Sequence, residues 1–146
     1  MIARVLKFAR LPRAERRLLL GAALALSATR LALLLPFALW RRLARLSAAT
    51  PQVPAQPQAK AADRIAWAVK TASRVVPGTS GCLVRALAAR AMMVRRGIAP
   101  ELKIGVAKDA RGQLRAHAWL EYDRETIAGT TRQPHFVPLA GLHGQV

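Results

Sequence analysis

A long apolar segment that leads into a proline-rich stretch is the feature that most constrains how this chain folds. Residues 11–46 contain no Gly/Pro cluster before Pro36, which predicts one long helix with a kink at that proline. Residues 48–60 hold three prolines and three glutamines with few apolar side chains, which predicts a solvated linker. The chain therefore divides into a basic helical arm over 1–47, the linker, and a domain over 61–146.

The arm raises the question of a membrane span. Residues 18–40 carry a single charge, Arg30, near the centre of the stretch, where a charge in lipid costs about 2.5–3.5 kcal/mol on an insertion scale. Arginines at both ends give no orientation, and the run is too late and too long for a secretory signal. A helix packed on its own domain, on a partner or on a membrane surface fits better than a span.

The formal net charge of +17 suggests a nucleic-acid or membrane partner, but its distribution weakens the first of these. The excess is +9 in residues 1–50, +7 in residues 51–100 and +1 in residues 101–146. Only seven residues are aromatic, so no platform of interleaved basic and aromatic side chains exists for base stacking. A basic binding protein for anionic membrane or nucleic acid stays open as an alternative, although we expect no nucleic-acid partner.

The sequence pattern of the domain predicts an α+β fold. Helical spacing of apolar residues predicts a helix over 61–76 and a second helix from Cys82 to about Arg96, with Thr79 or Ser80 as its cap. Alternation then predicts strands around 102–106, 113–122, 126–128 and 136–139, with a hairpin turn at 109–112. We expect the second helix to bury one stripe, which consists of Leu83, Val84, Leu87, Ala91 and Val94.

Cys82 is the first candidate functional residue. A lone cysteine excludes a disulfide within the chain and any Cys-rich metal site. In the first turn of a helix, after Gly81, its thiolate faces unsatisfied N–H groups and the positive end of the helix dipole. The same N–H groups can donate to an oxyanion when the thiolate attacks a carbonyl. The alternative is a small apolar core residue.

His117 is the second candidate. It lies on the polar face of a predicted strand with Trp119, between two alanines that leave room beside the ring. There it can take the thiol proton as general base and return it to a leaving amine as general acid. The alternative is a solvated or hydrogen-bonded strand histidine. His135 and His143 lie in predicted loop or tail segments, and we interpret them as structural.

The order of helix-start cysteine, hairpin and strand histidine resembles a known family. CLVRALA at 82–88, RRGI at 95–98, IGV at 104–106 and AHAWLE at 116–121 are similar to the transglutaminase-like cysteine peptidase of lasso-peptide biosynthesis, the B protein. The Leu/Arg-rich arm is also similar to the segment that precedes this domain in stand-alone members. The resemblance covers residues 11–140, and the AHAWLE strand with the upstream cysteine is its most specific part.

The resemblance implies a transglutaminase-like core in which the nucleophile helix packs on a small antiparallel sheet, with Cys82 as nucleophile and His117 as general acid/base. The family usually adds an Asp about a dozen residues after the histidine, where this chain has no carboxylate. Candidates for this third member are Glu121, Asp123 and Thr130, and Glu121 lies about 13 Å along the strand from His117. A working Cys–His dyad and a degenerate, inactive relative both remain open.

The resemblance also implies partners and a location. The substrate would be a lasso-peptide precursor, whose leader the enzyme removes; a separate chain would supply leader recognition, and an ATP-dependent synthetase would close the macrolactam. No metal and no cofactor are expected, and Gly81 and Trp119 would lie beside the reacting groups. We expect the cytoplasm, peripheral at the inner face of the membrane, with surface contact through 11–46. Transfer of the acyl group to an amine instead of water is a further alternative.

Overall fold

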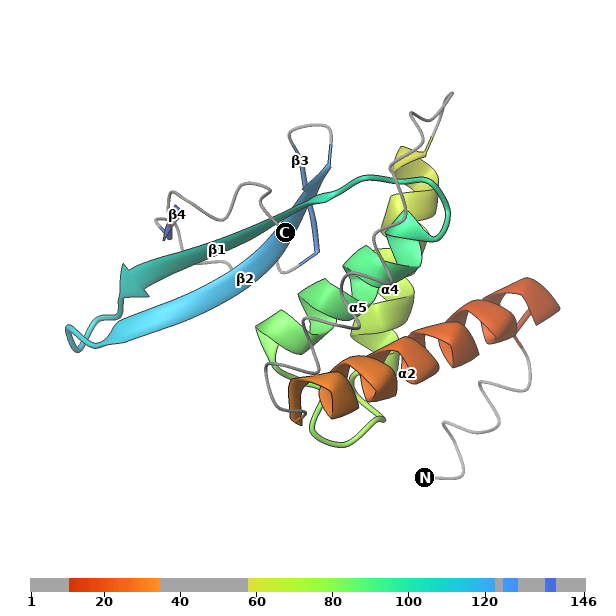
Figure 1. The fold of residues 1–146 in the computed structure, drawn as a ribbon, viewed down its shortest axis with the longest axis horizontal. Coiled ribbons are helices and arrows are strands. Elements are labelled where there is room, and N and C mark those ends of the chain that lie inside the picture. The colour runs from red at the N-terminus through yellow and green to blue at the C-terminus, as the bar shows by residue number, and fades with distance from the viewer. Residues whose placement is uncertain (1–10, 35–57, 123–124, 129–135, 139–146) are drawn as a thin grey trace.

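A computed structural model describes residues 11–34, 58–122, 125–128 and 136–138 and confirms the α+β architecture (Figure 1). In chain order, the elements in these residues are α2 (Arg13–Leu34), α4 (Ala59–Ala72), α5 (Cys82–Val94), β1 (Glu101–Lys108), β2 (Leu114–Tyr122), β3 (Glu125–Ala128) and β4 (Val137–Pro138). The predicted extension of the first helix to residue 46 and its kink at Pro36 lie outside the described residues, as does most of the linker.

The four strands form one antiparallel sheet in the order β3-β2-β1-β4. β1 and β2 are joined by the predicted hairpin, in a register that pairs Gly105 with His117. Alternation places Ala118 and Leu120 in the core that the sheet shares with the helices, as expected for that face of β2. Leu114 and Ala116 belong to the same face but are exposed, because the hairpin end of the two strands extends beyond the helices (Figure 1).

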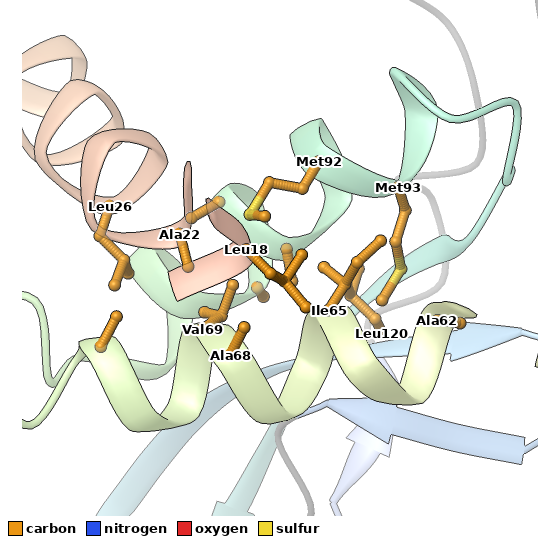
Figure 2. Packing of buried hydrophobic residues seen from close by; sticks show 14 of the residues in the cluster. Leu18, Ala22, Leu26, Ala62, Ile65, Ala68, Val69, Met92, Met93 and Leu120 are labelled. Carbon is orange, nitrogen blue, oxygen red and sulfur yellow. The ribbon is translucent and has the colours of Figure 1, made fainter. Parts of the chain in front are cut away.

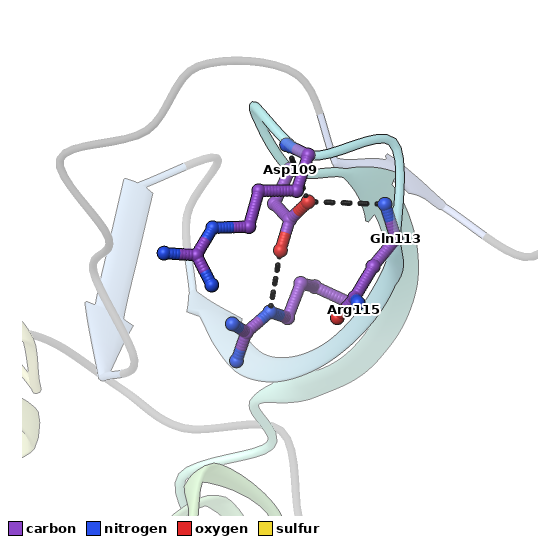
Figure 3. Close-up of polar contacts among 4 residues, drawn as sticks. Asp109, Gln113 and Arg115 are labelled. Atoms are coloured by element: carbon purple, nitrogen blue, oxygen red, sulfur yellow. Dashed lines mark hydrogen bonds and ion pairs between the residues drawn. The ribbon is translucent and has the colours of Figure 1, made fainter.

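Asp109 holds the hairpin turn together (Figure 3). Its Oδ1 accepts the backbone N–H groups of Arg111 and Gln113 at 2.9 and 3.0 Å, and its Oδ2 accepts Nε of Arg115 at 3.1 Å. The Gln113 N–H, followed by the Arg115 guanidinium, keeps the pKa of the Asp109 carboxyl below its ordinary value. Gly112 supplies the positive φ of +74° that the turn requires. The predicted turn at 109–112 is therefore correct.

The helix predicted as an arm packs on the rest of the fold. α2 contacts both α4 and α5, and one layer of buried side chains joins the three helices to the sheet (Figure 2). This layer includes Leu18, Ala22 and Leu26 from α2, Ile65 and Val69 from α4, Met92 and Met93 from α5, and Leu120 from β2. The sequence leaves open whether this helix packs on its own domain, on a partner or on a membrane surface, and in the structure it packs on its own domain. The division at residues 47 and 61 itself stays a prediction.

The buried face of α5 differs from the predicted stripe. Its buried residues are Val84, Ala86, Ala88, Ala89, Met92 and Met93, whereas Leu83 is 37% exposed and Ala91 is exposed. The reason is that α5 lies against α2 and α4 as well as against the sheet. Small alanine side chains allow this close packing on more than one side, and the larger leucine is left at the surface.

The helix predicted over 61–76 is also shorter than expected, since α4 ends at Ala72. The Ser73 hydroxyl donates to the Lys70 carbonyl at 3.0 Å, and the Arg74 N–H bonds three residues back, to Thr71. These bonds tighten the last turn and end the helix before Pro77.

The length and composition of α2 would allow it to cross a membrane. Core helices of soluble proteins and signal sequences have the same properties, and 22% of the apolar window of α2 is buried inside the fold. The buried part, which includes Ala22 and Leu26, belongs to the shared core.

Candidate active site

Cys82 is the first residue of α5 and lies at the edge of the helical core. The residue before it, Gly81, is the N-cap with an extended backbone (φ −61°, ψ 141°), and no side-chain cap bond closes this end of the helix. The thiol is free, half-buried and packed against the core cluster. A sulfur atom therefore lies at a helix N-terminus where, among the described side chains, none occupies the open N–H groups.

The predicted cap of α5 is wrong. Thr79 is fully buried, but its hydroxyl donates to the Val76 carbonyl at 2.8 Å instead of accepting from the helix, and Ser80 is exposed. Gly81 takes the N-cap position in their place. Because glycine has no side chain, it leaves the helix N–H groups open to a bound oxygen atom, which is the arrangement that an oxyanion site needs.

α2 supports the loop that leads into α5. Gly78 adopts the left-handed region with φ +71°, and a Cβ at this position would lie 3.3 Å from Nε of Arg30. The Arg30 guanidinium thus covers the Gly78 backbone. Arg30, whose charge argues against a membrane span in the sequence, therefore contacts the loop that precedes Cys82.

His117 belongs to a group of three rings, which we call the aromatic group: His117, Trp119 and Phe136. The imidazole lies 6.1 Å from Trp119, nearly parallel at 14°, and 5.0 Å from Phe136, between ring centroids. His117 and Trp119 alternate with the core residues Ala118 and Leu120 along β2, so their side chains lie on the face of the strand that is turned away from the core. The sequence predicts the pair on β2; it does not single out Phe136.

Gly105 makes room for the aromatic group. A Cβ at this position would lie 2.9 Å from Cη2 of Trp119 and 2.8 Å from the Val137 carbonyl oxygen. Both distances are shorter than real Cβ contacts, so the indole can lie across β1 only where the side chain is absent. A glycine inside a predicted strand is the sequence signal for such a close approach.

Glu121 contacts the aromatic group through the indole. The Trp119 Nε1–H donates to Oε1 of Glu121 at 2.7 Å, and the indole itself is only 9% exposed. Of the three candidates for a third member, Glu121 therefore contacts Trp119, the residue whose ring stacks on the imidazole. Asp123 and Thr130 lie outside the described residues.

The two main candidates come from elements that pack against each other, α5 and β2. Their surroundings differ: Cys82 packs on the helical core, whereas His117 lies on the face of β2 that is turned away from this core, with Trp119 and Phe136. In the described part of the chain, no group of three or more His, Cys, Asp or Glu side chains could hold a metal ion. A surface hollow lined by Glu15, Asp63, Arg64 and Trp67 contains neither candidate.

Comparison with known proteins gives one family. The family model described as "Transglutaminase-like superfamily" matches residues 22–141, which is more than half of the chain and includes both candidates. No curated protein and no solved structure matches the chain. The matched range begins inside α2, so the helix that packs on the core belongs in part to the matched region.

Proposed function

This chain belongs to the transglutaminase-like superfamily, and we propose that it is a cysteine peptidase that removes the leader from a lasso-peptide precursor. One observation carries the proposal: the free cysteine of the described residues is the first residue of a helix whose N-cap is glycine. A thiolate with open helix N–H groups beside it suits attack on a carbonyl carbon. The AHAWLE strand and the upstream cysteine favour the lasso-peptide branch of the superfamily.

The proposed reaction has two steps. His117 takes the thiol proton of Cys82 as the sulfur attacks the scissile carbonyl carbon, and N–H groups at the start of α5 hold the tetrahedral oxyanion. The C–N bond breaks as His117 gives this proton to the leaving amine. His117 then takes a proton from water, whose oxygen attacks the thioester carbon. Breakage of the C–S bond releases the leader with a carboxylate and returns the thiol. Each step uses residues of this chain and one water molecule.

We propose that Trp119 and Glu121 are positioning residues for His117. The carboxylate fixes the indole through the 2.7 Å hydrogen bond, and the indole stacks on the imidazole. In the proposed dyad, this ring packing would take over part of the orienting role of the family's Asp. An orienting contact favours one ring position without itself taking up a proton.

Loss of the indole contact should lower activity without abolishing it. We expect Glu121→Leu to lower kcat/KM by roughly tenfold to a hundredfold, because a small displacement of a catalytic ring has effects of this size. Glu121→Gln keeps an oxygen acceptor for the indole N–H and should lie close to wild type. The measurement is kcat/KM against pH, where a misplaced His117 also moves the pH profile. Equal profiles for all three proteins would contradict a positioning role.

We propose that the chain acts with other proteins. Its partners would be the precursor peptide, a separate leader-recognition protein and an ATP-dependent macrolactam synthetase, and its location would be the cytoplasm. The described part of residues 1–50 is α2, which packs on α4 and α5 as a part of this fold. The proposal needs no metal or bound cofactor.

A cleavage assay with and without the leader-recognition partner tests this arrangement. We expect slow cleavage of the precursor by this chain alone and a clear increase in rate when the partner is added, because the partner raises the local concentration of the scissile bond at Cys82. The products are measured by mass spectrometry. Equal rates with and without the partner would reject the prediction.

Transamidation uses the same two residues and is the second candidate. Its support is the name of the superfamily, since both reactions pass through a thioester on cysteine. The mass of the products separates them: hydrolysis adds one water across the broken bond, whereas transfer between side chains releases ammonia.

A further inference from the structure

α2 carries leucines on its outer side that the fold does not cover. Leu20, Leu24, Leu31 and Leu34 are 55%, 72%, 64% and 68% exposed. We call these four residues the leucine stripe. Their spacings of four, seven and three residues put them on one face of a helix, over a length of about 21 Å at 1.5 Å per residue.

The leucine stripe lies opposite the face that packs on the core. The buried residues of α2 are Leu18, Leu19, Ala22 and Leu26, and Figure 2 shows Leu18, Ala22 and Leu26 among the packed residues between the helices. The helix therefore has two apolar faces, of which the domain uses one. Scattered single leucines at a surface are ordinary, but an aligned row of this kind marks a contact site.

Basic residues accompany the stripe. Arg13 and Arg17 are exposed in the first turns of α2, on the side that the stripe continues, whereas Arg30 is directed at Gly78 of the domain. The helix has a single acid, Glu15. Apolar side chains together with cations are what an anionic bilayer surface binds, since acyl chains take the leucines and phosphates attract the arginines.

A second copy of the chain fits the stripe less well. Seen as a coiled-coil seam, residues 20–34 span only two heptads, and the polar Ser27 occupies one of the inward positions. Stable seams need three to four heptads. In a parallel pair, the arginines at the two N-termini would also face each other and repel.

We propose that the outer face of α2 binds the surface of an anionic lipid bilayer, with the leucine stripe in the interface and Arg13 and Arg17 at the headgroups. The inner face stays packed on α4 and α5, so the helix lies parallel to the bilayer and does not cross it. The Arg30–Gly78 contact then links the membrane-bound helix to the loop that precedes α5, on the side of α2 away from the bilayer.

Vesicle sedimentation with the full chain tests the proposal. We expect wild type to sediment with vesicles of phosphatidylglycerol and phosphatidylcholine, and more weakly with phosphatidylcholine alone or in high salt. Leu24→Gln with Leu31→Gln should lower the partition coefficient by about a hundredfold, roughly tenfold for each leucine. Glutamine is a good helix former, so the helix itself is kept.

The matched control is Leu114→Gln with Val137→Gln. These side chains are 71% and 66% exposed but lie on the sheet, so their loss removes similar apolar surface elsewhere and should leave vesicle binding unchanged. Thermal unfolding checks that both variants fold. The proposal would be overturned if the α2 variant bound vesicles as wild type does, or if both variants lost binding equally. It would also be overturned if wild type did not bind vesicles and instead formed a dimer that the α2 variant disrupts. The readout is lipid binding, so it is independent of the proposed peptidase activity.

Discussion

Replacement of Cys82 by alanine should abolish cleavage of the precursor in the presence of the leader-recognition partner. In the proposed mechanism the sulfur forms the thioester, and no other cysteine exists in the chain to replace it. Loss of the nucleophile in hydrolases that use a catalytic triad lowers kcat by about a millionfold, which leaves a rate below detection in an ordinary assay. The measurement is the time course of leader and core peptides by mass spectrometry.

The fold should tolerate this change. Cys82 is half-buried at the edge of the core, and alanine removes only the sulfur atom from a helix position where alanine is favoured. Equal thermal unfolding of variant and wild type would therefore assign the lost activity to chemistry. Cleavage by the alanine variant at the rate of wild type would remove Cys82 as the nucleophile and, with it, the proposed function.

His117→Ala belongs in the same experiment, because it tests whether His117 acts together with Cys82 in catalysis. If the imidazole serves as acid and base, this variant should approach the loss seen for Cys82→Ala, and the double variant should be no slower than the worse single one. If the variant cleaved at the rate of wild type, His117 would have no role as the acid and base, and its only assigned role would be ring packing in the aromatic group.

Replacement of Leu26 by alanine should lower the free energy of unfolding by about 2–5 kcal/mol, the range for a large-to-small change in a packed core. Leu26 is fully buried among α2, α4 and α5, although it comes from the segment that the sequence separates as an arm. Two residues away on the same helix, Leu24 is 72% exposed. Leu24→Ala should change stability by less than about 0.5 kcal/mol, as surface substitutions do.

This pair of variants measures whether α2 is a structural part of the domain. Urea unfolding, followed by far-ultraviolet circular dichroism without lipid, gives both values under identical conditions. The comparison cancels the effect of the leucine-to-alanine change on helix propensity, because both residues lie inside α2. Equal small effects would mean that the helix is detached from the core, as an arm.

Elements set by local chemistry were predicted well. The hairpin between β1 and β2 follows from alternating apolar residues and from an Asp and a Gly at the positions that the turn requires. The start of α5 at Cys82 follows from the Pro-Gly and Ser-Gly pairs that precede it. These signals act within a few residues, so they can be read without knowledge of the neighbours.

Features that depend on neighbours were predicted poorly. Helical spacing predicts a buried stripe that includes Leu83, Val84 and Ala91, but only Val84 of these is buried, because helices packed close on more than one side favour small alanines inside. Thr79 was assigned as a cap, yet it is buried in the loop and bonds backwards to Val76. In each case the deciding partner lies on another element or on the other side of a turn.

The class of fold, the place of Cys82 at the start of a helix and the shared strand face of His117 and Trp119 all follow from the amino-acid pattern. The packing of α2 on the domain, the cover of Gly78 by Arg30 and the bond of Glu121 to the indole beside His117 do not follow from it. The difference lies in range, because turns, caps and alternation depend on adjacent residues. Burial and side-chain pairing depend instead on which distant segments the folded chain brings into contact.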